Sequence, residues 1–265
     1  MDLGLRDRAC IITGASAGIG RVTAVTLAAE GASVLLVARR EQALAEAAQA
    51  CREAGGSAET LALDITAPDA GERVLETCLE RFGRVDALVN NAGTSAVRSL
   101  DQLTDEDWQT QWELHAMAPM RLMRAIAPVM ADRGWGRIVN VSSSSGKRPG
   151  QRNIAYSVTK AAELSLSRSF ADLYARRGVL VNAITPGPIA TELWTGPGGM
   201  AEQIAEAQGS TREQVLESIA AGVPVGRLGS EQEIAAVIAF LCSEPASYAA
   251  GAAWSVDGGL VQVII

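Results

Sequence analysis

The chain has 265 residues, of which 48% are hydrophobic and 20% charged, so it is long and apolar enough to bury a sizeable core. Its net charge of −7 and pI of about 4.9 provide no basic surface for phosphates, and nucleic-acid binding is not expected. The four cysteines, Cys10, Cys51, Cys78 and Cys242, show no paired spacing, which indicates free thiols in a reducing, cytoplasmic compartment. The chain begins without a signal-peptide profile and has no apolar run of the roughly 20 residues that a membrane helix needs, so we expect no membrane partner.

Short apolar runs alternate with longer helical stretches along the whole chain. The expected strands are 9–13, 33–38, 58–64, 86–93, 136–143, 178–184 and 252–257, and the first helices are expected at 20–32, 41–55 and 69–83. This alternation is typical of a parallel sheet with helices on both faces, and the near-continuous apolar strands agree because such strands are buried on both sides. The predicted fold class is therefore α/β, a Rossmann-type doubly wound parallel sheet of about seven strands, in a single domain over residues 1–265.

The segment TGASAGIG (13–20) directly follows the first expected strand and opens a helix. Gly14, Gly18 and Gly20 permit a tight turn and a close approach of phosphate to the helix N-terminus, where free N–H groups and the helix dipole favour anions. The spacing is G-x-x-x-G-x-G rather than the commoner G-x-G-x-x-G. Its place between a strand and a helix nevertheless indicates a dinucleotide site, with Ser16 and Ile19 as further contacts.

The end of the second strand, in VLLVARRE, bears on which dinucleotide binds. In doubly wound folds an acidic residue there bonds the ribose hydroxyl of NAD, whereas a basic one accommodates the additional phosphate of NADP. This chain has Ala38 followed by Arg39 and Arg40, and a guanidinium is well shaped for phosphate. The pattern favours NADP(H) over NAD(H); the alternative is a solvated pair of arginines at the start of a helix.

Tyr156 and Lys160, in YSVTK, lie four residues apart and would share one face of a helix. The same spacing occurs in ordinary amphipathic helices, so it does not decide the role alone. An ammonium one turn away favours the phenolate, which would suit the tyrosine to exchange a proton with a carbonyl or alcohol. The serine run 142–145 precedes it and fits either a catalytic hydroxyl or a polar turn.

Taken together, these motifs resemble the short-chain dehydrogenase/reductase family from about residue 5 to residue 260. They occur in order as TGASAGIG (13–20), LDI (63–65), NNAG (90–93), VSS (141–143), YSVTK (156–160), PGPIAT (186–191) and VDGG (256–259). The resemblance, to 3-oxoacyl-carrier-protein reductase-like members in particular, implies a ketoreductase that moves a hydride between a nicotinamide and a carbonyl or secondary alcohol. It also implies a homotetramer and a small-molecule substrate, free or bound to a carrier protein.

The resemblance further implies the roles of individual residues. Ser143, thirteen residues before Tyr156, would orient the substrate oxygen, Tyr156 would donate the proton, and Lys160 would tune the tyrosine and bond the nicotinamide ribose. The other implied cofactor contacts are Asp64 and Ile65 at the adenine, Asn90, Asn91, Ala92 and Gly93 beneath the ribose, and Pro186, Gly187, Ile189 and Thr191 toward the carboxamide.

His115, the only histidine, stands where the family carries an asparagine. As a candidate catalytic residue it would either preserve the backbone geometry or join the proton relay, since histidine titrates near neutrality; a tolerated packing substitution is the other interpretation. A metal role is not expected, because no second histidine or cysteine cluster completes a site. The departure leaves one alternative function, a catalytically weak, cofactor-binding regulatory or partner subunit.

Two segments are expected to enclose the substrate. Residues 192–229, with Trp194 and Met200, would form a mobile lid over the nicotinamide, and 146–153 would form another wall, with Lys147, Arg148 and Arg152 available for polar contacts. Which carbonyl compound they enclose does not follow from fold and motifs. The helices expected at 114–130 and 156–175 and the apolar tail 260–265 are expected at subunit contacts.

Overall fold

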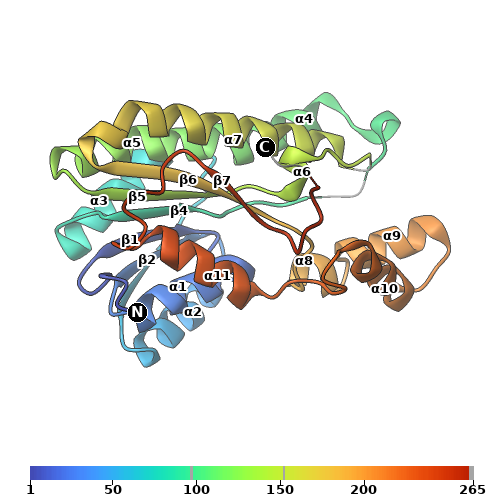
Figure 1. The fold of residues 1–265 in the computed structure, drawn as a ribbon, viewed down its shortest axis with the longest axis horizontal. Coiled ribbons are helices and arrows are strands. Elements are labelled where there is room, and N and C mark those ends of the chain that lie inside the picture. Colours follow the sequence, from blue (N-terminus) through green and yellow to red (C-terminus); the bar gives the residue numbers. More distant parts are fainter. Residues whose placement is uncertain (96–97, 152, 263–265) are drawn as a thin grey trace.

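The computed structural model describes residues 1–95, 98–151 and 153–262, which contain a seven-stranded sheet (Figure 1). The strands run parallel in the order β3–β2–β1–β4–β5–β6–β7. Their bounds are β1 Ala9–Thr13, β2 Ser33–Ala38, β3 Ser57–Ala62, β4 Ala87–Asn90, β5 Gly136–Val141, β6 Val179–Pro186 and β7 Ala253–Val256. The predicted fold class is confirmed, because the expected strands appear within a few residues of their predicted limits.

Helices cover both faces of the sheet (Figure 1). One face carries α1 (Gly18–Ala29), α2 (Glu41–Glu53) and α11 (Glu231–Leu241), and the other carries α3 (Ala70–Phe82), α5 (Ala118–Asp132) and α7 (Ile154–Tyr174). Alternate residues of β2 enter the two cores, Leu36 on the first side and Leu35 on the second, and both are fully buried. Each such leucine stabilises the fold by about 1.5–3 kcal/mol relative to an exposed one, which explains the continuously apolar strand.

A π-helical turn, Glu113–Met117, joins α4 (Asp105–Trp112) to α5. Thr104 begins α4 with a capping box, since its hydroxyl accepts from the Asp107 N–H and the Asp107 carboxylate accepts from the Thr104 N–H. The extra residue of the π-turn shifts the helix face at this point. The sequence predicted a helix over 114–130 but gave no indication of the π-turn.

Beyond β6, three helices lie past the end of the sheet (Figure 1): α8 (Glu192–Thr195), α9 (Met200–Gln208) and α10 (Arg212–Gly222). Ala201, Ala205 and Val215 give α9 and α10 a small core of their own. The short α6 (Ser144–Lys147) follows β5, and 3-10 turns occupy Leu100–Gln102 and Ala175–Arg177. The four cysteines are buried and free, as predicted. Within the described ranges, no helix is both long and apolar enough to cross a membrane.

Candidate active site

The predicted site residues meet at one edge of the sheet, where the parallel strands end. The strand order reverses between β1 and β4, whose outer neighbours are β2 and β5. At such a switch point the connections leave toward opposite faces and open a crevice for a ligand. The glycine-rich turn, the segment after β4, Ser143 after β5 and the loop after β6 all lie at this edge, which we call the carboxyl edge.

The glycine-rich turn has the backbone that its sequence predicts. Gly14 and Gly18 have φ of +66° and +59°, in the left-handed region that favours glycine. A Cβ on Gly20 would collide with the Gly14 carbonyl oxygen, so this position requires glycine for close packing. Ala17 precedes α1 and offers no capping side chain, which leaves first-turn N–H groups available to an anion. Gly18 is open toward Thr191, whose Cγ2 would lie 3.9 Å from an added Cβ.

Hydrogen bonds fasten the segment after β4 to the end of β1. The Thr13 hydroxyl accepts from the N–H groups of Asn91, at 2.9 Å, and Ala92, at 3.1 Å. The Asn91 amide nitrogen donates in return to the Thr13 carbonyl at 2.9 Å. Asn90 donates to Asn140 of β5 at 2.8 Å. These bonds lock the floor of the crevice, and the anchoring role of Thr13 was not anticipated from its place in the motif.

Two arginines stand beside the glycine-rich turn. Arg39 and Arg40 are exposed at the end of β2, and the Arg40 guanidinium donates to the Ser16 hydroxyl at 3.3 Å. Asp64 accepts from the Thr66 N–H at 3.0 Å and from its hydroxyl at 2.8 Å; these bonds lower the pKa of Asp64, with a smaller contribution from Arg39. Free guanidinium groups next to an uncapped helix N-terminus fit a dinucleotide with an additional phosphate. Ile19, in the glycine-rich turn, is half-buried, and Ile65, which follows Asp64, is buried.

The loop after β6 closes the crevice from the other side. Ile189 is buried and forms a bridge with Gly229, where an added Cβ would lie 2.6 Å from its Cδ1. Gly187 follows Pro186 at the end of β6 and packs against the backbone of Asp257. A Cβ added to Gly187 would lie only 2.9 Å from the Cα of Asp257. These close approaches fix the path of the loop, so that Thr191 lies opposite the glycine-rich turn.

Tyr156 and Lys160 project from the first turns of α7. The Lys160 Nζ lies 5.8 Å from the centroid of the half-buried Tyr156 ring. The same ammonium donates to the Val141 carbonyl at 2.9 Å and to Glu163 Oε2 at 2.8 Å. Burial raises the pKa of Glu163 to about 7, with Lys160 acting in the opposite direction. The sequence predicted the tyrosine and lysine but not the buried carboxylate.

The four serines after β5 differ in what they bond. Ser142 is buried and donates to the Lys160 carbonyl at 2.9 Å. Ser143 caps α6, where its oxygen accepts from the Ser145 N–H at 3.1 Å, and it remains half-buried. A hydroxyl that accepts through its oxygen keeps its own proton for another acceptor. Of these two, Ser143 has the free donor that the chemistry requires.

His115 lies in the π-turn and is fully buried. Its Nε2 accepts from the Thr94 N–H at 3.2 Å, and its Nδ1 lies 3.1 Å from the Thr159 hydroxyl. That hydroxyl donates to the Tyr156 carbonyl at 2.9 Å, so it accepts from an Nδ1 proton and fixes the tautomer. Burial and then the charge of Lys160 hold the pKa of His115 well below its usual range. The ring packs edge-on against Tyr156, with centroids 5.3 Å apart.

A cavity of about 180 Å³ opens beside Tyr156. Its wall combines apolar surface, from residues such as Leu103 and Ala155, with polar groups that include Ser95, Gln111 and the ion pair between Arg98 and Asp107, whose closest atoms are 2.5 Å apart. The Ser95 hydroxyl and the Gln111 Oε1 atom are buried and have no hydrogen-bond partner among the residues that the structure describes. Buried polar groups without partners are rare, so these two atoms are positioned for a polar ligand.

The wall predicted from 146–153 is only partly as expected. Lys147 turns away from the cavity, since its Nζ donates to the Ala253 carbonyl at 2.7 Å and the Ser255 hydroxyl at 2.9 Å. Arg148 is exposed, and Arg152 lies outside the described residues. Asn153 replaces them as the polar side chain of this segment that lines the cavity. Among the described residues, no group of three or more potential ligands is suited to a metal ion.

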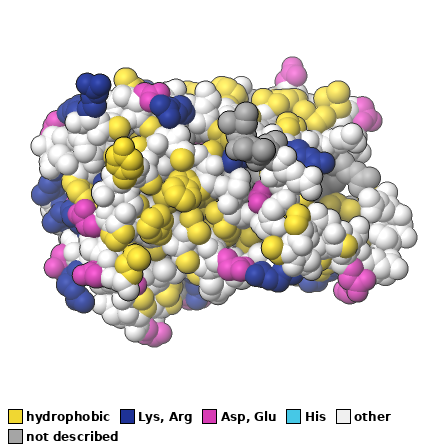
Figure 2. Space-filling model, viewed as in Figure 1, with side chains coloured by type: hydrophobic (Ala, Val, Ile, Leu, Met, Phe, Trp, Pro, Cys, Tyr) yellow, Lys and Arg dark blue, Asp and Glu magenta, His cyan; other side chains and the backbone are white. Residues whose placement is uncertain are grey.

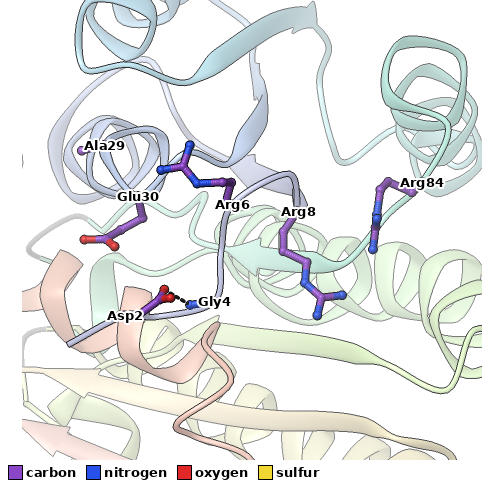
Figure 3. A pocket seen from close by; sticks show the side chains of 7 residues that line it. All are labelled: Asp2, Gly4, Arg6, Arg8, Ala29, Glu30 and Arg84. Carbon is purple, nitrogen blue, oxygen red and sulfur yellow. Dashed lines mark hydrogen bonds between the residues drawn. The ribbon is translucent and has the colours of Figure 1, made fainter.

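A larger cavity, of about 590 Å³, lies away from this chemistry (Figure 3). It is lined by Arg6, Arg8 and Arg84 together with Asp2 and Glu30, at the amino ends of the strands. None of the predicted site residues lines it. The candidate active site is therefore chosen for its convergence of glycine-rich turn, tyrosine, lysine and serine, and not for the size of its cavity.

Known proteins are similar to this chain over nearly its whole length. The family model described as short chain dehydrogenase matches residues 8–198. The short-chain reductase protein NovJ of Streptomyces niveus is 36% identical over 96% of this chain and 94% of its own. The 3-oxoacyl-[acyl-carrier-protein] reductase FabG of Escherichia coli is 36% identical over 98% of this chain and 100% of its own.

Among solved structures, the L-sorbose reductase from Gluconobacter frateurii complexed with NADPH and L-sorbose superposes with a TM-score of 0.93. It is 37% identical to this chain, and the match covers 100% of both chains. A levodione reductase structure matches with a TM-score of 0.89 and 30% identity over 96% of this chain and 97% of its own. With family model, full-length relatives and fold in agreement, the chain belongs to the short-chain dehydrogenase family.

Proposed function

We propose that this protein is an NADP(H)-dependent ketoreductase in which Ser143, Tyr156 and Lys160 carry out the proton chemistry. The observation that carries this proposal is the arrangement at the carboxyl edge. There Lys160 Nζ lies 5.8 Å from the centroid of the Tyr156 ring, and the Ser143 oxygen accepts from a backbone N–H, which leaves its proton free. A proton donor, a neighbouring cation and a hydroxyl donor are the groups that carbonyl reduction needs.

The reduction proceeds through groups already in place. NADPH, when bound, supplies the hydride that reduces the carbonyl carbon. Tyr156 gives its phenolic proton to the carbonyl oxygen, so that the alcohol forms and a phenolate remains. The Lys160 ammonium stabilises that phenolate, and the Ser143 hydroxyl donates to the oxygen as negative charge develops on it. Oxidation of the alcohol follows the same steps in reverse.

The preference for NADP(H) rests on the arginines at the end of β2. Arg39 and Arg40 are exposed, Arg40 contacts Ser16 of the glycine-rich turn, and no acidic side chain occupies the position of Ala38. The family neighbours crystallised with NADPH or NADP, including the sorbose reductase, support the same preference. Lys160 would bond the nicotinamide ribose, and Asn90 to Gly93 would form the floor beneath it.

The substrate that fits the cavity best is a small ketone bearing hydroxyl groups. Relatives point two ways, to a sugar in the sorbose reductase and to a carrier-bound acyl group in the FabG proteins. The Ser95 hydroxyl and Gln111 Oε1, which have no partner among the described residues, favour a substrate that brings hydroxyl groups of its own over a plain carrier-bound acyl chain. Hydroxyl groups of the substrate would satisfy both atoms. Helices α8 to α10 would form the lid over them.

A screen that follows loss of NADPH absorbance tests this proposal. Hydroxylated ketones, plain alkyl ketones and 3-oxoacyl thioesters of matched length would each be offered with NADPH and with NADH. Turnover of at least one ketone with NADPH, and its loss in Tyr156→Phe, is the expected result. NADPH binding without turnover of any compound would instead support the alternative, a regulatory or partner subunit of this family.

We further propose a homotetramer that works in the cytoplasm. Hydrophobic side chains gather on the face over α11 and β7 (Figure 2), where Tyr248 and Trp254 are exposed. On α7, Val158 and Leu173 are exposed as well, and a subunit contact would cover them. The buried free cysteines suit a reducing compartment. Residues 263–265, half of the segment 260–265 predicted at a subunit contact, lie outside the described residues. Light scattering at micromolar concentration tests the assembly, and a monomer would refute it.

A further inference from the structure

A carboxylate that the reaction as described does not use lies against the active-site lysine. Glu163 is on α7, three residues after Lys160, and its Oε2 accepts from the Lys160 Nζ at 2.8 Å. The two side chains are 2% and 3% exposed, so the pair is withdrawn from water. A buried ion pair is weak evidence for stability, because desolvating both charges offsets their attraction. A reason for keeping it at this place must therefore be sought in what the lysine does.

The hydrogen bonds of the ammonium suggest that reason. A lysine has three N–H donors, and the protein accepts two of them, through Glu163 and the Val141 carbonyl at 2.9 Å. A Cβ added to Gly93 would lie 3.7 Å from the Lys160 Nζ, so the ammonium borders the exposed residues Gly93 and Thr94 that follow β4. Two fixed acceptors leave one donor, and they hold a flexible side chain in a single orientation.

We propose that Glu163 is a positioning residue that fixes the Lys160 ammonium and sets how much of its positive charge reaches Tyr156. This inference rests on the proposed roles of Tyr156 and Lys160. With Glu163 ionised, its negative charge opposes the field of the lysine, and phenolate forms less readily. With Glu163 protonated, the full positive charge acts on the tyrosine.

Glu163 changes charge in the range where such an enzyme works, since burial raises its pKa to about 7. Among the described residues, Lys160 is the charged neighbour that opposes this rise, and burial and then Lys160 lower the pKa of His115 in the π-turn, which keeps its ring neutral. Other ionisable side chains on elements packed against α7 either bond other groups or are exposed, as Asp105, Glu106, Arg124 and Arg176 are. Lys147 bonds β7, Arg121 pairs with Glu113, Asp132 pairs with Arg177, and Arg137 bonds the Ser243 carbonyl.

Glu163→Gln separates charge from position, because the amide oxygen still accepts from Nζ while the negative charge is gone. Two quantities would be measured in this variant and in wild type. The first is the pH dependence of kcat/KM with NADPH saturating. The second is the pH at which the phenolate absorbance of Tyr156 appears in the protein without cofactor, taken as the difference from the matching Tyr156→Phe protein. Both should move to lower pH by about one unit.

Glu163→Ala removes the acceptor as well, so the lysine loses its orientation. The expected result is a loss of about tenfold or more in NADPH affinity and in kcat/KM. Glu163→Asp, which restores a carboxylate, should recover part of both, and it keeps the positioning role testable if the glutamine variant fails to fold. Asp172→Asn is the matched control, because Asp172 lies on the same helix and pairs with Arg168 in solvent. It should change none of these values.

The outcomes separate the inference from the proposed function. A variant that is less stable than wild type but has an unchanged pH profile and phenolate titration would overturn the inference and leave a purely structural pair. A shifted phenolate titration in a protein that reduces no ketone would retain the inference and reject the ketoreductase. Equal shifts in Glu163→Gln and Asp172→Asn would also overturn it, because a distant charge would then act as strongly as the buried one.

Discussion

The two ends of the sheet carry charged groups in opposite ways. At the amino ends of the strands, Asp86 accepts from Arg84 at 2.6 and 2.7 Å and from the Ala9 N–H at 2.8 Å, and Arg8 pairs with Glu244 at 2.7 Å. At the carboxyl edge, Arg39 and Arg40 make no ion pair within the described part of the chain. Charges at the amino ends are largely satisfied within the fold, whereas the two exposed arginines at the carboxyl edge are available to a ligand.

The difference follows from the direction of parallel strands. Each strand is followed by a helix, so the carboxyl edge gathers the N-termini of these helices and their unpaired N–H groups. The amino ends receive the C-termini of helices, where arginines are favoured and pair with acidic groups. This is why the larger cavity is bordered by Arg6, Arg8 and Arg84 (Figure 3), whereas the smaller cavity is the one that Tyr156 lines. The amino ends should therefore serve stability and the carboxyl edge activity.

The largest effect on activity is expected from Tyr156→Phe at the carboxyl edge. The ring and its contact with His115 remain, and only the proton donor disappears. Loss of a general acid costs about 10²–10⁴ in rate, so turnover should nearly vanish while NADPH binds and the melting temperature stays within a few degrees. Single-turnover rates and NADPH titration would measure this. Retention of a tenth of wild-type turnover would contradict the role of Tyr156.

The largest effect on stability is expected from Asp86→Ala at the amino ends. The carboxylate is buried, and its removal leaves the Ala9 N–H without an acceptor and Arg84 without its partner. Unfolding should become easier by roughly 2–4 kcal/mol, with kcat per folded molecule unchanged. Denaturant titration together with the specific activity of the folded fraction is the measurement. A large fall in the kcat of the folded protein would contradict the conclusion that the amino ends serve stability and the carboxyl edge serves activity.

The sequence predicted most of the carboxyl edge because its motifs are local. A glycine-rich turn after a strand and a tyrosine one helical turn before a lysine need no distant partner to be recognised. Lys147 shows the limit: it lies near Tyr156 in the sequence, but it bonds β7 more than a hundred residues away. Glu163 shows another limit. Polar residues on a helix normally face solvent, and only tertiary packing buries Lys160, Glu163 and Ser167 on α7.

A third test concerns the cofactor. Arg39→Ala should weaken NADPH relative to NADH by about 10- to 150-fold, since a charge-assisted contact to phosphate contributes roughly 1.5–3 kcal/mol. Arg40→Ala should act in the same direction, because Arg40 contacts Ser16 of the glycine-rich turn. Dissociation constants for both cofactors would be compared with Arg6→Ala, an arginine bordering the larger cavity. An unchanged ratio in both Arg39 and Arg40 variants, or a wild type that prefers NADH, would refute the assignment.

The smallest effect is expected at His115, although its ring packs against that of Tyr156. Both ring nitrogens are bonded and the ring is fully buried, so the imidazole has no free position for a moving proton. His115→Asn should therefore keep kcat/KM within about tenfold, with a similar pH profile. Loss of more than about a hundredfold, roughly 2.7 kcal/mol of barrier, would instead make the histidine part of the relay.

The same variant should change how stability depends on pH, and the sign can be worked out. The pKa of His115 is well below its usual 6.5 in the folded chain, because burial disfavours the charged form. As pH falls through about 6.5, the unfolded chain binds a proton that the folded chain does not, so wild type loses stability there. Asparagine does not titrate, and the stability of wild type relative to the variant should fall between pH 7 and pH 5. Denaturant titrations across that range would measure it, and parallel curves would mean that His115 takes up a proton as readily in the folded chain as in the unfolded one.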